Sequence, residues 1–266
     1  MRSFARLRSV AIVALVGAGV GGCSPAAGPS GAPPSIAPSV AIATDPTPTA
    51  AATASLRPAS AAPSDIPGFE GWTANKPLSV AISTDGGSLV LRLTHQALWF
   101  NAERGVLFSK PVDGDLRISA TVRVAKTSDP TAPPGRAGIA QLAGLMVRAD
   151  RSPEDYAFVV IGDGGDGTSV ETKSTDDSLS VYDGPRWPEP AADLRLCRVG
   201  ATVTSYKRPA GSDGAWTQAA TYQRPDLPTT LQVGVNVYSS GTPDITARFD
   251  DIVIASIAKG AECTAD

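Results

Sequence analysis

Histidine is nearly absent from this chain of 266 residues, which contains only His95. A Ser-His-Asp triad, or a zinc site with histidine ligands, would have to be built around this one residue. It lies in the sequence LTHQALWF, near the end of an apolar run, and no Gly-x-Ser-x-Gly elbow occurs anywhere in the chain. We therefore expect His95 at a surface or an edge and predict neither a His-based hydrolase nor a zinc enzyme.

Helical periodicity and clusters of basic residues are also lacking. No window of a dozen residues shows the apolar spacing of a surface helix. Lys and Arg are scattered singly. Loss of the first 22 residues would remove three arginines from the 23 basic residues of the chain and leave 20 against 26 acidic residues, a net charge of −6. Because nucleic acid and anionic lipid headgroups favour a basic surface, we expect neither as a partner.

The apolar run near the N-terminus, Val10–Val20, is too short for a membrane span of about 20 residues. It follows three arginines and is typical of a secretory signal. It ends in Val20-Gly21-Gly22-Cys23, which resembles a bacterial lipobox, whose cysteine receives a lipid and becomes the new N-terminus. We predict a lipoprotein signal peptide over 1–22, a membrane anchor at Cys23 and a lipid-anchored, extracytoplasmic place in the bacterial cell envelope. The alternative is an ordinary secretory signal with an incidental cysteine.

The segment after Cys23 is made almost entirely of Pro, Ala, Ser, Thr and Gly, with no aromatic residue. Such a composition buries too little apolar surface to offset the entropy cost of ordering. We predict a disordered linker over 23–65 that holds a folded domain, 66–266, away from the membrane. An unselected low-complexity segment is the alternative.

The rest of the chain shows the two-residue alternation of half-buried strands. In DLRISATVRVAK the apolar residues from Leu116 to Val124 fall on one face and the polar residues on the other. Gly- and Asp-rich turns separate the apolar or alternating stretches 88–94, 143–149, 156–162, 194–199, 229–239 and 245–257. This pattern predicts an all-β domain, an antiparallel sandwich of two sheets or a jelly roll.

Four motifs, in order, resemble the concanavalin A-like lectin/glucanase sandwich, and within it the bacterial laminin-G-like and regulation-of-enolase type. They are AGLMVRADRSPEDYAFV, LRLCRVGATVTSYKRPAGSDGAWTQ, TTLQVGVNVYSS and ARFDDIVI, and they cover residues 138–254. The hairpin Tyr206–Ser212 is longer than that family's usual one, which places ligand contacts from this loop in question. The resemblance implies a concanavalin A-like jelly roll, favoured as a monomer.

Glucanases of this superfamily carry Glu-x-Asp-x-Glu or Glu-x-Asp-x-x-Glu on one strand. The chain has six glutamates, and none is followed by Asp two residues later. The resemblance therefore favours a non-catalytic module that binds carbohydrate at the cell surface. Two alternatives stay open, a glycoside-active enzyme with non-standard carboxylates and a protein–protein interaction module of the envelope.

Candidate glycan contacts come from two places in the sequence. In LQVGVNVYS the valines alternate with polar and aromatic residues, and Arg148 shares that second face; the loop VYDGPRWPEP adds an aromatic residue between prolines. Trp187 in this loop has an alternative role as a cap on the core, and Trp72, Trp99 and Trp216 are expected in core or hairpin packing. The predicted ligand-binding residues are Arg148, Tyr182, Arg186, Trp187, Asn236 and Tyr238.

Calcium is the cation that oxygen-rich turns of this sandwich type favour. The resemblance points to Asp250 and Asp251, and strand alternation from Phe249 predicts that Asp251 faces inward. An inward carboxylate needs a metal or a structural hydrogen bond, and both remain open. The glycine-rich stretch 162–169 also resembles a calcium-binding loop, but a hairpin loop is the simpler interpretation.

Two cysteines remain besides Cys23. Because export places them in an oxidising compartment, Cys197 and Cys263 are predicted to form a disulfide that pins the C-terminal tail to a strand. Two free thiols are the alternative.

Overall fold

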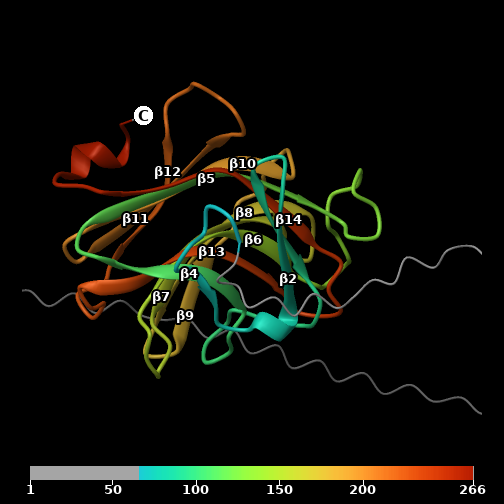
Figure 1. The fold of residues 1–266 in the computed structure, drawn as a ribbon, viewed down its shortest axis with the longest axis horizontal. Coiled ribbons are helices and arrows are strands. Elements are labelled where there is room, and N and C mark those ends of the chain that lie inside the picture. The colour runs from blue at the N-terminus through green and yellow to red at the C-terminus, as the bar shows by residue number, and fades with distance from the viewer. Residues whose placement is uncertain (1–65, 266) are drawn as a thin grey trace, which may run out of the picture. The chain divides into compact units, whose positions relative to one another are not determined.

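The computed structural model of this protein describes residues 66–265. These residues form two antiparallel sheets of seven strands each, which lie one above the other in Figure 1. The all-β class and the two-sheet sandwich predicted from the sequence are thus confirmed. The predicted signal peptide, the anchor at Cys23 and the linker lie outside the described residues. Within the described part, no helix is long and apolar enough to span a membrane.

The first sheet has one two-residue strand at an edge and six longer strands. In spatial order it consists of β1 (Thr73–Ala74), β4 (Val106–Asp113), β13 (Thr230–Ser239), β6 (Gln141–Arg148), β7 (Tyr156–Asp163), β8 (Thr168–Asp176) and β9 (Leu179–Asp183). Strand β9 is the free edge on the far side, and all but one of its residues are exposed.

The second sheet is formed from both ends of the described chain. In spatial order it consists of β12 (Thr217–Gln223), β11 (Thr202–Pro209), β10 (Ala191–Val199), β5 (Leu116–Ala125), β14 (Thr246–Ser256), β3 (Ser88–Leu93) and β2 (Val80–Asp85). Two short 3-10 turns, η2 (Pro77–Ser79) and η3 (Gly260–Cys263), complete the described elements.

The main core lies between the sheets. Strand β5 follows the predicted alternation, with its apolar side chains from Leu116 to Val124 buried and its polar ones turned outward. Valines of β13 and β6 meet them from the first sheet, and Phe249 of β14 is buried in the same cluster. Burying these side chains supplies most of the stabilisation, at about 25 cal/mol per Å² of apolar surface.

A second apolar cluster lies on the outer face of the first sheet, where a two-layer sandwich would ordinarily meet water. All eight residues of β6 and all eight of β7 are buried, so these strands are covered on both sides. The cluster contains Trp99, Leu107, Leu142, Met146, Tyr156, Phe158, Val160 and Tyr238. Trp99 belongs to residues 94–105, which we call the covering segment because they lie over this face.

The predicted disulfide between Cys197 and Cys263 is present, with a Cα–Cα separation of 5.8 Å. It joins β10 to η3 and brings the C-terminal tail onto the outer face of the second sheet. Arg195 of β10 supports the tail by donating to the carbonyl oxygens of Cys263 at 3.0 Å and Ala265 at 2.9 Å.

The inward orientation predicted for Asp251 is wrong. Strand β14 contains a β-bulge between Asp250 and Val253, and Asp251 has a positive φ of 52° and is exposed. The extra residue shifts the alternation, so that Ile252 and Ile254 pack towards the core while Val253 is 47% exposed. Strict period-2 alternation therefore fails at the bulge.

Candidate functional site

The outer face of the first sheet brings polar and aromatic side chains from five strands together. Antiparallel pairing places Phe158 of β7 opposite Lys173 of β8, and Lys173 opposite Tyr182 of β9. Because side chains alternate along a strand, Glu171 of β8 and Tyr238 of β13 project from this same face. The predicted contacts Arg148, Asn236 and Tyr238 lie on it too, as the alternation of LQVGVNVYS indicated.

The covering segment is held on this face by hydrogen bonds at both ends. Gln96 Nε2 donates to the carbonyl of Ser240 at 2.8 Å, and the Ser239 amide donates to the carbonyl of Ala97 at 2.8 Å. Farther along, the Asn101 amide donates to Ser180 Oγ at 2.9 Å. His95 in this segment is exposed, as predicted, and neighbours Thr94 Oγ1.

Trp99 is the deepest side chain of the covering segment and is fully buried. Its ring lies 5.2 Å from that of Tyr156 in an edge arrangement, and the guanidinium of Arg148 lies 5.9 Å from its centroid. Its Nε1 donates to the carbonyl of Val106 at 3.4 Å. Trp99 thus fills space over the sheet, and its predicted packing role is confirmed.

Lys173 is a buried ammonium surrounded by aromatic rings. Its Nζ lies 4.9, 5.3, 5.4 and 6.0 Å from the ring centroids of Phe100, Phe158, Tyr182 and Tyr238. Its one hydrogen bond goes to the carbonyl of Trp99, at 2.8 Å, and among residues 66–265 no carboxylate comes within ion-pair distance. Burial disfavours the charged form and lowers the pKa of Lys173 to about 8.

Glu171 lies two residues before Lys173 and is half-buried at the border of this cluster. Burial raises the pKa of its carboxyl above the ordinary value, against a hydrogen bond from Ser169 Oγ at 3.1 Å. The pKa of Tyr238 is raised well above its usual range, first by burial and then by the negative charge of Glu171. Several ionisable groups of one face thus have perturbed pKa values, which is typical of functional sites.

Arg148 is committed to protein partners and is not a free ligand contact. Its Nε donates to Glu154 Oε2 at 2.9 Å and its Nη1 donates to Gln232 Oε1 at 2.7 Å. Arg148 and Glu154 are both buried, and Arg104 of the covering segment also pairs with Glu154. The prediction placed Arg148 on the correct face, and the structure gives it a role in holding the covering segment.

Asn236 is the opposite case. Its side chain is fully buried in the centre of this face, next to Gly144 in the strand register. Neither its Nδ2 nor its Oδ1 has a hydrogen-bond partner among the described residues. A buried amide without partners is costly, and such groups call for an explanation.

The three predicted residues of the proline-rich loop have different environments. Tyr182 is 64% exposed and stands over Lys173. Arg186 pairs with Asp166 at 2.9 Å. Trp187 is half-buried against the main core and donates from Nε1 to the carbonyl of Ala191 at 3.0 Å, so its alternative role as a cap describes it better.

Asp250 and Asp251 do not form a common site. Asp250 accepts hydrogen bonds from Ser88 and Arg123, and Arg248 lies 3.5 Å away. Protein groups thus contact Asp250, while Asp251 is exposed at the bulge.

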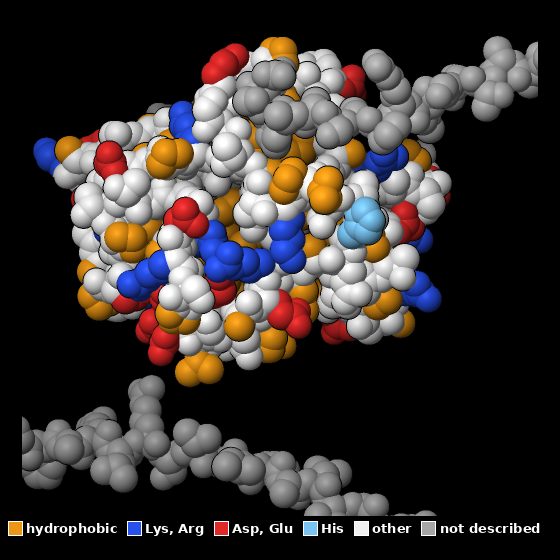
Figure 2. Space-filling view, turned by 60° about the horizontal axis from the view of Figure 1, so that its bottom comes forward, with side chains coloured by type: hydrophobic (Ala, Val, Ile, Leu, Met, Phe, Trp, Pro, Cys, Tyr) orange, Lys and Arg blue, Asp and Glu red, His pale blue; other side chains and the backbone are white. Residues whose placement is uncertain are grey.

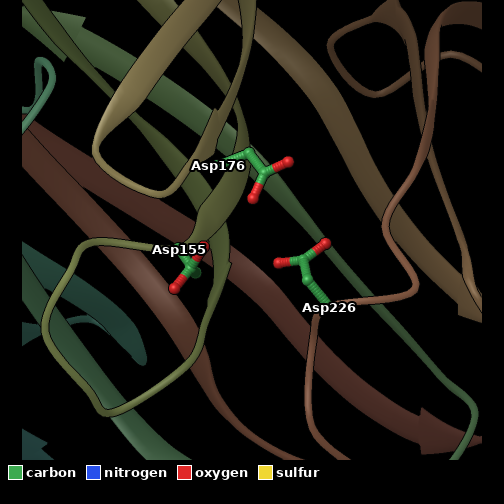
Figure 3. A group of neighbouring side chains, drawn as sticks. All are labelled: Asp155, Asp176 and Asp226. Atoms are coloured by element: carbon green, nitrogen blue, oxygen red, sulfur yellow. The ribbon is translucent and has the colours of Figure 1, made fainter.

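A different group of carboxylates meets elsewhere in the fold. Figure 3 shows Asp155, Asp176 and Asp226, whose oxygens lie within 4.8 Å of one another. Arg224 donates to both oxygens of Asp226, at 2.7 and 2.8 Å, and pairs with Asp155 at 3.4 Å. Arg151 adds a second positive charge beside Asp155. These arginines compensate Asp155 and Asp226, while the third carboxylate, Asp176, is exposed.

No protein-family model and no curated protein sequence matches the chain. Among solved structures, a functionally unknown protein from Saccharomyces cerevisiae has a TM-score of 0.59 at 13% identity, over 72% of this chain and 99% of that one. A GH43 protein from Bacillus licheniformis has a TM-score of 0.53 at 12% identity, over 70% of this chain and 37% of that one. Lectin I-B4 from Griffonia simplicifolia has a TM-score of 0.47 at 14% identity, over 71% and 94%. The first two likenesses show that the sandwich fold is shared.

Sequence reasoning missed Glu171, Lys173 and the covering segment. Apart from Val170, residues 169–175 (SVETKST) are all polar, so that nothing in the pattern shows that the face of Glu171 and Lys173 is covered. The apolar residues of LTHQALWF were the available signal, because a tryptophan and a phenylalanine between two strands have to be packed somewhere.

Proposed function

We propose that this domain is a non-catalytic carbohydrate-binding module, and that the glycan binds where Phe100 and Tyr182 meet the surface above Lys173. The observation that carries the proposal is this pair of exposed rings, 39% and 64% exposed, whose centroids lie 4.9 and 5.4 Å from a buried ammonium. Aromatic rings pack against the apolar faces of pyranoses. The ammonium and the half-buried Glu171 can then donate to and accept from sugar hydroxyls.

The charges around this position favour a neutral glycan. The charges of Asp163 and Asp166 act on Glu171, and Arg186 pairs with Asp166. On the side of the domain that faces down in Figure 1, Figure 2 shows Lys and Arg side chains in a row across the middle, with acidic and hydrophobic side chains around them. Because charges of both signs lie here, a neutral glycan meets no strong repulsion.

We also propose that the domain is displayed outside the cell from a lipid at Cys23. The support is the sequence alone: the short apolar run, its arginines and the lipobox-like end. A lipid anchor joined to residues 23–65 would place the glycan site at the cell surface, which suits a binding module.

The glycoside-active alternative needs two carboxylates on opposite sides of a bond, about 5–10 Å apart. Glu171 is one carboxyl with a raised pKa, and a protonated acid is half of such a pair. Asp163, its acidic neighbour, is occupied, since its Oδ1 accepts from the amides of Gly165 at 2.6 Å and Gly167 at 2.9 Å. The geometry therefore favours binding over hydrolysis.

The test is binding of the full chain to a panel of neutral and acidic polysaccharides, measured by calorimetry with and without calcium. Tyr182→Ala removes an exposed ring and is expected to weaken binding about tenfold or more, the order found for central aromatic contacts. Tyr206→Ala, on the second sheet, is the matched control and should change nothing. Absence of binding to every polymer, or equal loss in both variants, would refute the proposal.

One observation favours a second function, protein–protein interaction. Edge strand β9 exposes Leu179 by 73% and Val181 by 64%, on the face opposite to Tyr182. An exposed apolar edge strand is a template for pairing with another extended chain. Capture of an envelope protein that is lost on Val181→Lys, with glycan binding absent, would establish this function instead.

A further inference from the structure

Lys173 has the environment of a reactive amine. An ammonium has three hydrogen-bond donors, and Lys173 uses one, to the carbonyl of Trp99. The remaining donors face aromatic rings, so that the charged form is stabilised by cation–π attraction and by the nearby charge of Glu171. Since burial lowers its pKa to about 8, the Lys173 side chain is neutral in about a tenth of the molecules at pH 7. A desolvated lysine of this kind is the usual starting point for imine chemistry.

The amine is shielded by only one layer of side chains. Two of the four rings around it, Phe100 and Tyr182, are themselves partly exposed. Tyr182 belongs to the exposed edge strand β9, and Phe100 to the covering segment. A small molecule that reaches Nζ therefore has to displace Phe100 or Tyr182, whereas Phe158 and Tyr238 form the buried wall behind it.

Glu171 supplies the second group that imine formation needs. Residues 171 and 173 project from the same face of β8, and the charge of Glu171 acts on Lys173. Burial raises the pKa of Glu171, so it retains a proton at a higher pH than an exposed glutamate. An acid beside an amine assists loss of water from the first adduct.

We propose that Lys173 forms a reversible imine with the aldehyde at the open-chain reducing end of a sugar. The inference rests on the glycan site proposed above and names its substrate class as carbonyl-bearing sugars. The site then captures chain ends in preference to chain interiors.

The atoms balance without an oxidant or a reductant. The lone pair of the neutral Nζ adds to the aldehyde carbon, the C=O π electrons move to the oxygen, and a proton passes from nitrogen to oxygen to give a carbinolamine. The C–O bond then breaks as Glu171 donates a proton to the departing hydroxyl. Water leaves, nitrogen forms a double bond to carbon, and the resulting iminium can return its proton to Glu171. Hydrolysis reverses each step.

The other lysines provide internal comparisons. Lys207 also has a pKa lowered by burial, but it is only half-buried, with one ring, Trp187, 5.1 Å from its Nζ and Asp183 nearby. Lys110 lies 6.0 Å from Trp72 on a more open surface. Neither has a carboxyl with a raised pKa two residues away on its strand.

The test is peptide mapping of the full chain after exposure to glycolaldehyde and cyanoborohydride at pH 7, in a buffer without amines. Hydride from the reagent reduces an iminium to a stable amine. We expect labelling at Lys173 to exceed that at each of the other five lysines by about tenfold or more. Lys173→Arg should abolish this label, and Lys207→Arg, the matched control, should leave it intact.

Glu171→Gln keeps the shape of the side chain and is expected to slow labelling of Lys173 about tenfold to a hundredfold without shifting the melting temperature. This variant tests imine formation at Lys173 even where Lys173→Arg fails to fold. Labelling of Lys173 no faster than that of Lys126 or Lys259 would overturn the proposal.

Failure of the imine and failure of the glycan function are separable. An oligosaccharide and its borohydride-reduced alditol differ only at the reducing-end residue, which loses its ring and its latent aldehyde. Equal binding of the two without labelling at Lys173 would refute the imine and leave the glycan function standing. Labelling at Lys173 with no polysaccharide bound would support the reactive amine and refute the glycan function.

Discussion

The two buried regions of this domain differ in kind. Between the sheets, the side chains are aliphatic and aromatic, and each strand alternates between this core and its outer face. Beneath the covering segment, the buried set includes Arg148, Glu154, Lys173 and Asn236 alongside the aromatic rings. The first region is what any sandwich needs to fold. The second carries ionisable groups that folding alone does not require.

This difference teaches where to look for function. Burying a charge is costly unless it is paired, and a buried amide without partners loses the hydrogen bonds it made to water. The Arg148–Glu154 pair offsets that cost with hydrogen bonds. Lys173 does so only in part, and the Asn236 side chain has no hydrogen-bond partner among the described residues. Natural proteins tend to depart from well-packed, fully hydrogen-bonded interiors at their functional sites.

The largest expected effect belongs to the core between the sheets. Phe249→Ala deletes a fully buried ring from the main cluster and is expected to lower the free energy of unfolding by about 3–5 kcal/mol. Phe100→Ala, in the covering segment, should cost about 1 kcal/mol or less, because its ring is 39% exposed. Urea denaturation of the full chain measures both, and equal losses would contradict the distinction between the two regions.

A somewhat smaller loss is expected beneath the covering segment. Glu154→Gln removes the charge that both Arg148 and Arg104 contact, and should cost about 3 kcal/mol because the buried Arg148 guanidinium then keeps only the exposed Asp150, 3.6 Å away, as a counter-charge. Replacing both members of the buried pair, Arg148→Met with Glu154→Leu, should recover most of that loss. A double variant no more stable than Glu154→Gln would show that the pair stabilises the fold in its own right.

The smallest expected effect is on the pH dependence of stability. The folded pKa of Lys173, about 8, lies below the ordinary 10.5 of the unfolded chain, so the unfolded state holds more protons between these values. Stability should therefore rise by about 1–2 kcal/mol between pH 7 and 9.5 on account of this residue.

Lys173→Met, measured by urea denaturation across that range, should abolish this rise. The range ends below pH 10 because burial also raises the pKa values of Tyr156 and Tyr238, whose unfolded forms ionise first and lower stability above that pH. A wild-type slope unchanged by the substitution would mean that Lys173 is fully charged in the folded state.

The alternation of strand residues was enough to predict the sandwich, but not which outer face would be covered. Strand β5 obeys the pattern because only one of its faces is buried. Strands β6 and β7 are buried on both faces, and there the cover comes from Trp99, about 45–60 positions earlier in the sequence. Local periodicity carries no information about a contact between such distant residues.

The same reasoning explains which candidate site residues were placed correctly from the sequence and which were not. Arg148, Asn236 and Tyr238 were placed on one face because two-residue periodicity is reliable within regular strands. Trp187 and Asp251 lie in a loop and at a bulge, where side-chain direction depends on backbone geometry that composition does not encode.

The bond between Cys197 and Cys263 limits how far this domain can be stretched. It encloses β11 to β14, with a sequence separation of 66 residues, and no force applied at the chain ends can extend that loop. At about 3.5 Å per extended residue, the oxidised domain lengthens by about 230 Å less than the reduced one when it is pulled apart. Strands β1 to β9 would yield first under load, while the loop that carries β13, and with it Asn236 and Tyr238, would remain tied to β10.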